Sequence, residues 1–228
     1  MKNFKRIFAL LLCLCIVMLS ACQDSNKPDS QPKVTLYGYQ FPAVLDDITI
    51  EKCSLYSGEY IEDASFENCE NVAALTVKNN SEKDIQLLRI KLQTQSKDML
   101  FEVTTLTAGS TATVLEKTKQ TLTEEDKIYS LTIENRADFS ENVSLKDKDI
   151  LIQGNLKTIN IKNISKKDIE NDIYIYYKKK DENGNFLGGL TFRTKAEGGI
   201  KAGEIKQLPA DSFDPADSVV VFVDYVQQ

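Results

Sequence analysis

The sequence predicts an all-β protein with two tandem β-sandwich domains, over residues 34–135 and 136–228. Two observations support this prediction. An eleven-residue pattern occurs twice, as Leu-Thr-Val-Lys-Asn-Asn-Ser-Glu-Lys-Asp-Ile at residues 75–85 and as Ile-Asn-Ile-Lys-Asn-Ile-Ser-Lys-Lys-Asp-Ile at residues 159–169. Short runs of alternating apolar and polar residues are separated by turn-forming residues, and no long amphipathic helical pattern occurs. Such an internal repeat indicates a structural unit that is used twice.

Each copy of the repeat reads as two antiparallel strands and the turn between them. A period of two marks a half-buried strand, and clusters of Asn, Ser and Asp mark a turn. The identical pairs are Lys78 and Lys162, Asn79 and Asn163, Ser81 and Ser165, Lys83 and Lys167, Asp84 and Asp168, and Ile85 and Ile169. The repeat therefore predicts the same strand, turn and strand in both domains.

The first 22 residues have the pattern of an export signal. A positively charged start is followed by twelve apolar residues, 7–18, and by Leu19-Ser20-Ala21-Cys22. Twelve apolar residues suit a signal peptide and are too few to span a bilayer, which takes about 20. The last four residues resemble the lipobox of bacterial lipoproteins. The resemblance implies that residues 1–21 are removed and that Cys22 carries a diacylglycerol with acyl chains such as palmitate.

A lipid on Cys22 would place the protein on the extracytoplasmic face of the cell membrane, because two acyl chains give a stable anchor. The alternative is an ordinary secretory signal with an incidental cysteine. Residues 22–33 are polar, contain two prolines and have no large apolar residue, so they read as a disordered tether. Its residues after Cys22 span at most about 35–40 Å when extended, which keeps the domains near the membrane.

Composition limits the classes of function. Without residues 1–21, which hold three cations and no acid, the chain carries 25 Lys and Arg against 34 Asp and Glu, a net charge of −9. An acidic surface argues against a nucleic-acid partner. The absence of His from the chain removes Ser-His and Cys-His nucleophile pairs and most catalytic zinc sites. We predict no catalytic residue, no metal ligand set and no cofactor.

The first domain is expected to contain short strands joined by turns. Alternation is clearest over residues 85–92, where Leu88, Ile90 and Leu92 share one face. Residues 121–127 suit a single helical turn, because Thr123 precedes acidic residues. The strands expected here cover residues 34–41, 48–53, 72–77, 85–92, 99–106, 111–115 and 129–133.

The second domain repeats this order. Its expected strands cover residues 150–161, 169–177, 186–192 and 219–223. Asn183-Gly184 predicts a hairpin with a type I′ turn, in which both central residues have positive φ. About seven short strands per copy is the pattern of an immunoglobulin-like sandwich, although the buried Trp and cysteine pair of that fold are missing. Residues 136–149 offer no Pro- or Gly-rich hinge, so we expect the two domains to touch.

The second domain also resembles the immunoglobulin-like, FxLYD-like modules of surface lipoproteins from Gram-positive gut anaerobes. The resemblance covers residues 150–228 well and residues 72–133 more loosely. It implies an immunoglobulin-like fold and a cell-surface address, and it brings no catalytic residues. The residues that carry it are Ile159-Asn-Ile-Lys-Asn-Ile-Ser165, Asp172-Ile-Tyr-Ile-Tyr-Tyr-Lys178, Phe186-Leu-Gly-Gly-Leu-Thr-Phe-Arg193 and the closing run 218–225.

Cys53 and Cys69 are the cysteines that remain after the signal peptide and the lipidated Cys22 are set aside. An even pair in an exported domain favours a disulfide, which would close a loop of about 16 residues and stabilise the fold by about 3 kcal/mol. The alternative is two free thiols, one of them buried.

Several acidic clusters are candidates for cation or catalytic sites. Residues 181–192 fail the EF-hand pattern, because Phe186 and Phe192 stand where that loop needs Gly and Glu, so a hairpin is favoured. The clusters 124–126 and 211–217 read as solvated faces. A carboxylate-based hydrolase is the least favoured function, because nothing in the sequence marks a pair of acids.

Tyr174 and Tyr176 form the candidate binding surface. A period of two puts Ile173 and Ile175 on one face of the strand and the two tyrosines on the other, beside Lys178 and Lys180. If the isoleucines face the core, the tyrosines can stack on a sugar or a peptide. The alternative is that they pack under a loop, against the first domain or across neighbouring strands.

Together these features predict a membrane-anchored, non-enzymatic binding or adhesion module with a surface protein or glycan as partner. The alternative is a structural or accessory subunit of an envelope complex or transporter, which the short tether would suit.

Overall fold

The computed structural model describes residues 32–225, which contain strands and turns and no helix. The signal peptide predicted over residues 1–21, the lipid site at Cys22 and all but the end of the predicted tether lie outside the described residues. The single helical turn predicted over residues 121–127 is wrong. Thr123 instead begins a turn in which the Asp126 N–H donates to the Thr123 carbonyl oxygen at 3.1 Å.

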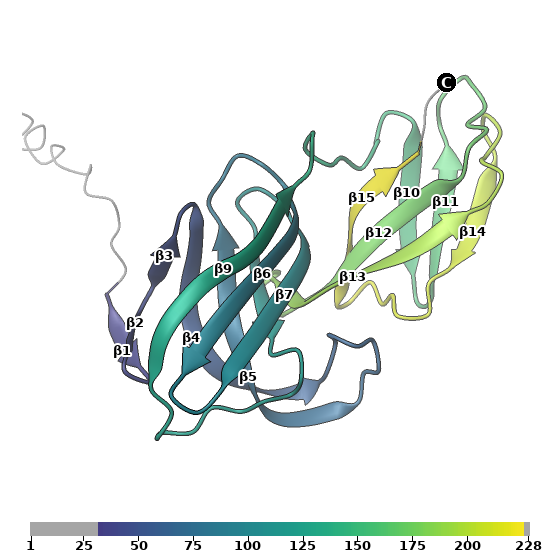
Figure 1. Ribbon diagram of the computed structural model, residues 1–228. Coiled ribbons are helices and arrows are strands. Elements are labelled where there is room, and N and C mark those ends of the chain that lie inside the picture. The colour runs from purple at the N-terminus through teal and green to yellow at the C-terminus, as the bar shows by residue number, and fades with distance from the viewer. Residues whose placement is uncertain (1–31, 226–228) are drawn as a thin grey trace, which may run out of the picture. The chain divides into compact units, whose positions relative to one another are not determined.

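Fifteen strands are present in the described part of the chain. The strands of the first half are β1 (Val34–Leu36), β2 (Tyr39–Phe41), β3 (Ala43–Leu45), β4 (Ile48–Glu59), β5 (Asn68–Asn79), β6 (Ile85–Thr94), β7 (Asp98–Leu106), β8 (Thr111–Leu115) and β9 (Ile128–Asp138). Those of the second half are β10 (Ile150–Asn155), β11 (Thr158–Asn163), β12 (Ile173–Lys180), β13 (Phe186–Ala196), β14 (Ile205–Pro209) and β15 (Ser218–Asp224). Figure 1 shows the two groups of strands in different colours along the chain.

The order of strands is the same in both halves. In the first half β4, β5 and β8 are neighbours in one sheet, and β7, β6 and β9 form the other. In the second half β10, β11 and β14 form one sheet, and β13, β12 and β15 are neighbours in the other. The prediction of an all-β sandwich is therefore confirmed. Strands β13 and β8 also pair with each other, so that one seven-stranded sheet runs through both halves.

Each half encloses its own group of buried apolar side chains. Alternation explains why: in β6 the buried residues follow every second position, and their neighbours are partly exposed. The first core includes Ile48, Leu75, Val77, Leu88, Ile90, Leu92, Met99 and Phe101. The second includes Ile159, Ile161, Ile173, Ile175, Tyr177, Phe213 and Val223.

The repeated turn of the first half is built around the buried side chain of Asn79. Its Nδ2 donates to the carbonyl oxygens of Lys83 (2.8 Å) and Leu106 (3.0 Å). Its Oδ1 accepts the N–H (3.0 Å) and the hydroxyl (2.7 Å) of Ser81. Asp84 closes the turn, because its Oδ1 accepts the N–H of the residue at position 108 at 2.7 Å.

The second half repeats this network bond for bond. Asn163 Nδ2 donates to the carbonyl oxygens of Lys167 (2.7 Å) and Ile200 (3.1 Å), and its Oδ1 accepts the N–H and hydroxyl of Ser165. Asp168 Oδ1 accepts the N–H of the residue at position 202 at 2.8 Å. The residues that are identical in sequence therefore make the turn, and their conservation between the copies has a structural cause.

The disulfide predicted between Cys53 and Cys69 is not formed, and both residues are buried free thiols. The register of β4 on β5 gives the reason: Cys53 lies opposite Leu75, whereas Cys69 lies opposite Gly58. Positions 53 and 58 of β4 are about 16 Å apart at the usual rise of a strand. A disulfide needs Cα atoms within about 7 Å of each other, so the alternative of two free thiols is the correct one.

Candidate functional site at the junction of the two halves

The hairpin of β12 and β13 carries the second half to the first. Its turn is stabilised by Asp181, whose Oδ1 accepts the N–H groups of Asn183 and Asn185, both at 2.9 Å. The predicted hairpin is therefore present. Its predicted type I′ geometry is wrong, because Gly184 has a φ of +82° while Asn183 is not among the residues with positive φ.

The end of this hairpin pairs with an edge strand of the first half. Phe186 and Leu187 of β13 lie opposite residues 112 and 113 of β8 in parallel register. Just beyond them, a Cβ atom at Gly189 would lie 1.8 Å from the carbonyl oxygen of Glu102 in β7. The backbones of β13 and β7 thus approach as closely as only glycine permits, as the start of β13 beside β7 in Figure 1 illustrates.

Lys178 is enclosed at this contact and is fully buried. Its Nζ donates to the carbonyl oxygens of Thr104 (2.9 Å), Gly189 (2.9 Å) and Leu190 (3.1 Å), and it lies 3.3 Å from Thr191 Oγ1. Among the described residues no carboxylate forms an ion pair with it. Burial lowers the pKa of Lys178 to about 7, although the charge of Glu62 opposes this shift.

The position of Lys178 differs from the sequence prediction, which put it in solvent beside Tyr174 and Tyr176. Its ammonium group instead bonds the Thr104 carbonyl oxygen of the first half and is covered there. The register of β12 is also irregular between Tyr177 and Lys179. Alternation predicts which face a residue occupies and cannot predict what covers that face.

Glu62 ties β8 to β13 from the loop that follows β4. Its Oε1 accepts the N–H of Leu115 (2.8 Å) and that of Gly189 (2.9 Å), and its Oε2 also lies 2.9 Å from the Gly189 nitrogen. Burial raises the pKa of Glu62, and these backbone N–H groups and the charge of Lys178 oppose the shift. The carboxylate is thus engaged in holding two strands of different halves together.

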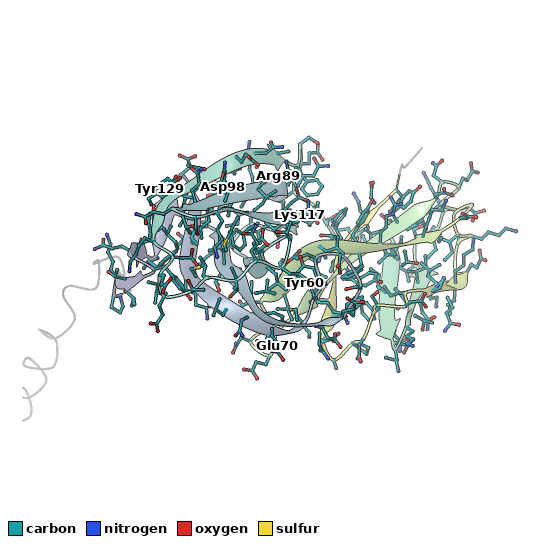
Figure 2. All side chains as sticks on the ribbon, turned by 60° about the horizontal axis from the view of Figure 1, so that its bottom comes forward. Tyr60, Glu70, Arg89, Asp98, Lys117 and Tyr129 are labelled. Atoms are coloured by element: carbon teal, nitrogen blue, oxygen red, sulfur yellow. The ribbon has the colours of Figure 1, made fainter. Side chains whose placement is uncertain are left out.

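A cavity of about 50 Å³ lies at the junction, between Glu62, Glu102, Thr104, Lys117 and Gly189. It has room for only a few water molecules, whereas ligand pockets usually measure about 300–1,000 Å³. Burial alone would raise the pKa of Glu102, but hydrogen bonds from Lys117 and Arg89 outweigh it and lower the pKa. Figure 2 shows Arg89 and Lys117 close together at the end of the first half.

The polar groups of the junction are therefore satisfied by one another and leave little space for a substrate. Lys178, Glu62 and Gly189 bind the two halves together, and Thr104 adds a hydrogen bond of 3.1 Å to the Gly189 carbonyl oxygen. The sequence did not predict that Lys178, Glu62 and Gly189 join the two halves. The pair Gly188-Gly189 inside an expected strand was the available signal, because glycine within a strand often marks a close approach of another backbone.

Comparisons with known proteins give no relative from which a function can be read. No family model, no curated protein and no solved structure matches the chain. The part of the chain from residue 32 to residue 225 has no helix that could cross a bilayer.

Tyr174 and Tyr176 lie on the face of β12 opposite the core, as predicted if the isoleucines are buried, and both are partly buried. Tyr176 stacks on Phe222 of β15, with ring centroids 4.1 Å apart and an angle of 8° between the planes. Tyr174 lies under the guanidinium of Arg193, whose carbon is 5.0 Å from the ring centroid. Lys195 lies 5.9 Å from the same centroid.

In each of the acidic clusters 124–126 and 211–217, one carboxylate is bonded to protein groups. Asp126 accepts hydrogen bonds from Ser96 (2.8 Å) and from the N–H and hydroxyl of Thr123 (2.9 and 3.0 Å). Asp217 forms an ion pair of 2.8 Å with Lys179. Within residues 32–225 no group of three or more potential ligands could hold a metal ion.

Proposed function

We propose that the protein is a lipid-anchored, extracytoplasmic binding module that holds a surface protein or glycan through the outer face of the β13-β12-β15 sheet. The observation that carries the proposal is the pair of partly buried rings Tyr176 and Tyr174, which lie opposite Arg193 and Lys195 of β13. The buried ring of Phe222 lies under Tyr176. Aromatic rings flanked by cations suit a carbohydrate or an acidic peptide segment.

The junction supports this proposal because it would hold the binding face in a fixed position. Lys178, on the hairpin that carries the tyrosines, donates to the Thr104 carbonyl oxygen of the first half. Glu62 of the first half accepts the N–H of Gly189 on the same hairpin and that of Leu115 on β8. A surface held by rigid strands loses less conformational entropy when it binds than a mobile loop does. The cross-strand packing of Tyr176 on Phe222 has the same effect.

The binding surface is tested by comparing two alanine variants, one at a tyrosine on the proposed face and one at a tyrosine outside it. Residues 23–228, fluorescently labelled, are added to envelope fractions of the source cells with and without prior protease treatment, so that a protein partner and a glycan partner are distinguished. Tyr174→Ala should reduce binding at least tenfold. Tyr129→Ala is the matched control, because Tyr129 is 61% exposed on the outer face of β9 in the first half, where Figure 2 shows it away from the junction. Equal binding by both variants would refute the proposal.

The anchor is tested separately with Cys22→Ala. We expect the full chain to partition into the detergent phase and this variant to stay in the aqueous phase, because the thiol that takes the lipid is lost. A membrane fraction unchanged by the substitution would contradict the lipoprotein proposal. The alternative role, as an accessory subunit of an envelope complex, rests on the short tether and predicts that the binding partner co-purifies in a fixed ratio.

A further inference from the structure

Arg193 is an exposed cation on the face of the β13-β12-β15 sheet that carries Tyr174 and Tyr176, here called the tyrosine face. Its guanidinium carbon lies over the Tyr174 ring, 5.0 Å from the centroid. Within residues 32–225 the guanidinium makes no hydrogen bond and no ion pair, and residues 226–228, Val-Gln-Gln, bring no acidic side chain. The ring supports the guanidinium from one side and leaves its N–H donors available to a ligand.

The other arginines of the described part of the chain show what such a group binds. Arg89 donates from Nε to Glu102 Oε2 at 2.9 Å. Arg136 grips Asp47 with both ends of its fork: Nη1 donates to Oδ1, and Nη2 donates to Oδ2 at 3.2 Å. Both pairs use the planar fork that matches a carboxylate. Among the arginines of residues 32–225, Arg193 alone has no carboxylate, although it is exposed to receive one.

The charges around Arg193 limit the kind of anion that fits. Lys195, the neighbouring cation, is already paired with Asp172 at 3.2 Å and with Glu197 at 3.0 Å. Asp224 is exposed and lies opposite Tyr174 on β15. A ligand with closely spaced negative groups would meet these three carboxylates and be repelled. The tyrosine face therefore suits a ligand with one isolated carboxylate.

The rest of the tyrosine face suits a sugar better than a peptide backbone. Strand β12 is paired on both sides, with β13 and with β15, so it offers no open edge to which a peptide strand could be added. The hydroxyl groups of Tyr174 and Tyr176 make no hydrogen bond in the described part of the chain. A sugar can place its C–H groups against the rings and its hydroxyls against the tyrosine hydroxyls and the Asp224 carboxylate.

We propose that the tyrosine face binds a carboxylate-bearing glycan, whose carboxylate is held by the guanidinium fork of Arg193 while the sugar ring lies against Tyr174 and Tyr176. This inference rests on the proposed function and names its ligand class. Hexuronic acids and sialic acids both supply the required chemistry, a single carboxylate on a sugar rich in hydroxyl groups.

The test compares each acid with its own methyl ester, which keeps the sugar and removes the charge. Residues 23–228, labelled with ¹⁵N, are titrated with tetragalacturonate and with sialyllactose, and then with the two esters. We expect at least one acid to give saturable shifts of the Tyr174, Tyr176 and Arg193 amide signals, which identifies the source of the carboxylate. Its ester should bind roughly tenfold or more weakly, because hydrogen bonds to the charged group are lost.

Three variants separate the fork of Arg193 from its charge. Arg193→Gln should weaken binding of the acid roughly tenfold or more and should change binding of the ester little. Arg193→Lys keeps the charge and loses the fork, so it should also weaken binding of the acid. Lys162→Gln is the matched control, because it removes one cation from an exposed position of β11, in the other sheet, and should leave binding unchanged. Circular dichroism checks that each variant is folded.

Four outcomes would overturn the proposal: no saturable shifts with either acid, equal binding of acid and ester, undiminished binding of the acid by Arg193→Gln, or tighter binding of a blocked hexaglutamate peptide than of either acid. The last outcome would make the ligand an acidic peptide. Binding of Tyr174→Ala to envelope fractions separates this failure from that of the proposed function. If that variant still binds the envelope more weakly than wild type, only the ligand class is wrong.

Discussion

Replacing Gly189 by alanine tests the junction most sharply. The added Cβ atom would lie 1.8 Å from the Glu102 carbonyl oxygen, so β13 and β7 would have to separate by about 1.5 Å to reach an ordinary contact distance. That movement would weaken the bonds from Lys178 to Thr104 and from Thr104 to Gly189. Each such bond contributes about 0.5–1.5 kcal/mol net, and overpacking costs about 1–3 kcal/mol. Loss of both bonds together with overpacking should therefore lower the free energy of unfolding by about 2–6 kcal/mol.

The free energy of unfolding is measured by urea denaturation followed by circular dichroism, since the chain has no Trp for fluorescence. Gly203→Ala is the control. Gly203 has a φ of +78° and a Cβ atom there would meet nothing within 4 Å, so only the backbone conformation should cost stability, by about 1–2 kcal/mol. If Gly189→Ala costs no more than this control, the close approach of β13 to β7 does not hold the halves together.

Three further predictions concern buried polar groups. Burial lowers the pKa of Lys178 to about 7, and the unfolded value is near 10.4, so the unfolded chain binds more protons between these values and stability rises with pH. Relative to Lys178→Met, the wild type should therefore gain about 2–3 kcal/mol from pH 7 to pH 9 in urea denaturation; parallel pH curves would contradict this. Burial alone would raise the pKa of Asp126, but hydrogen bonds led by that from the Thr123 N–H outweigh it and lower the pKa. Its stabilising effect is thus present above the unfolded pKa near 3.9 and lost as the pH falls below it, so Asp126→Asn should lower the melting temperature at pH 7 and lessen the loss of stability in acid. An acid limb identical in variant and wild type would refute this. Finally, alkylation without reductant should modify Cys53 and Cys69 only after denaturation, because both are buried thiols and burial raises the pKa of Cys53 to about 12; a disulfide-linked peptide in mass spectrometry would show the opposite.

The sequence predicts what depends on local pattern. The turns at Asn79 and Asn163 are recognisable because their hydrogen bonds join residues close in the chain, so identical residues give identical turns. The faces of β6 and β12 follow from alternation, which groups Leu88 with Ile90 and Ile175 with Ile173, and both of these faces line the cores.

What the sequence does not predict depends on contacts between distant strands. The burial of Lys178 requires that β13 pair with β8, and nothing in either strand's own pattern states its partner. The separation of Cys53 from Cys69 follows from the register of β4 on β5, which an even number of cysteines does not reveal. The contact of Asp84 with Asn142 joins residues 58 positions apart, so no local pattern reveals it.

The central claim is that one sandwich occurs twice and that each copy has its own core. It is tested most directly by producing residues 136–228 alone and recording the thermal transition together with the amide spectrum. The account predicts a cooperative transition and a dispersed spectrum, with a midpoint below that of the full chain, because Lys178 loses the Thr104 carbonyl and residues 139–143 lose the Asp84 turn. A fragment with no cooperative transition and no dispersed spectrum would contradict the claim, and the chain would then be one continuous sandwich that draws strands from both copies.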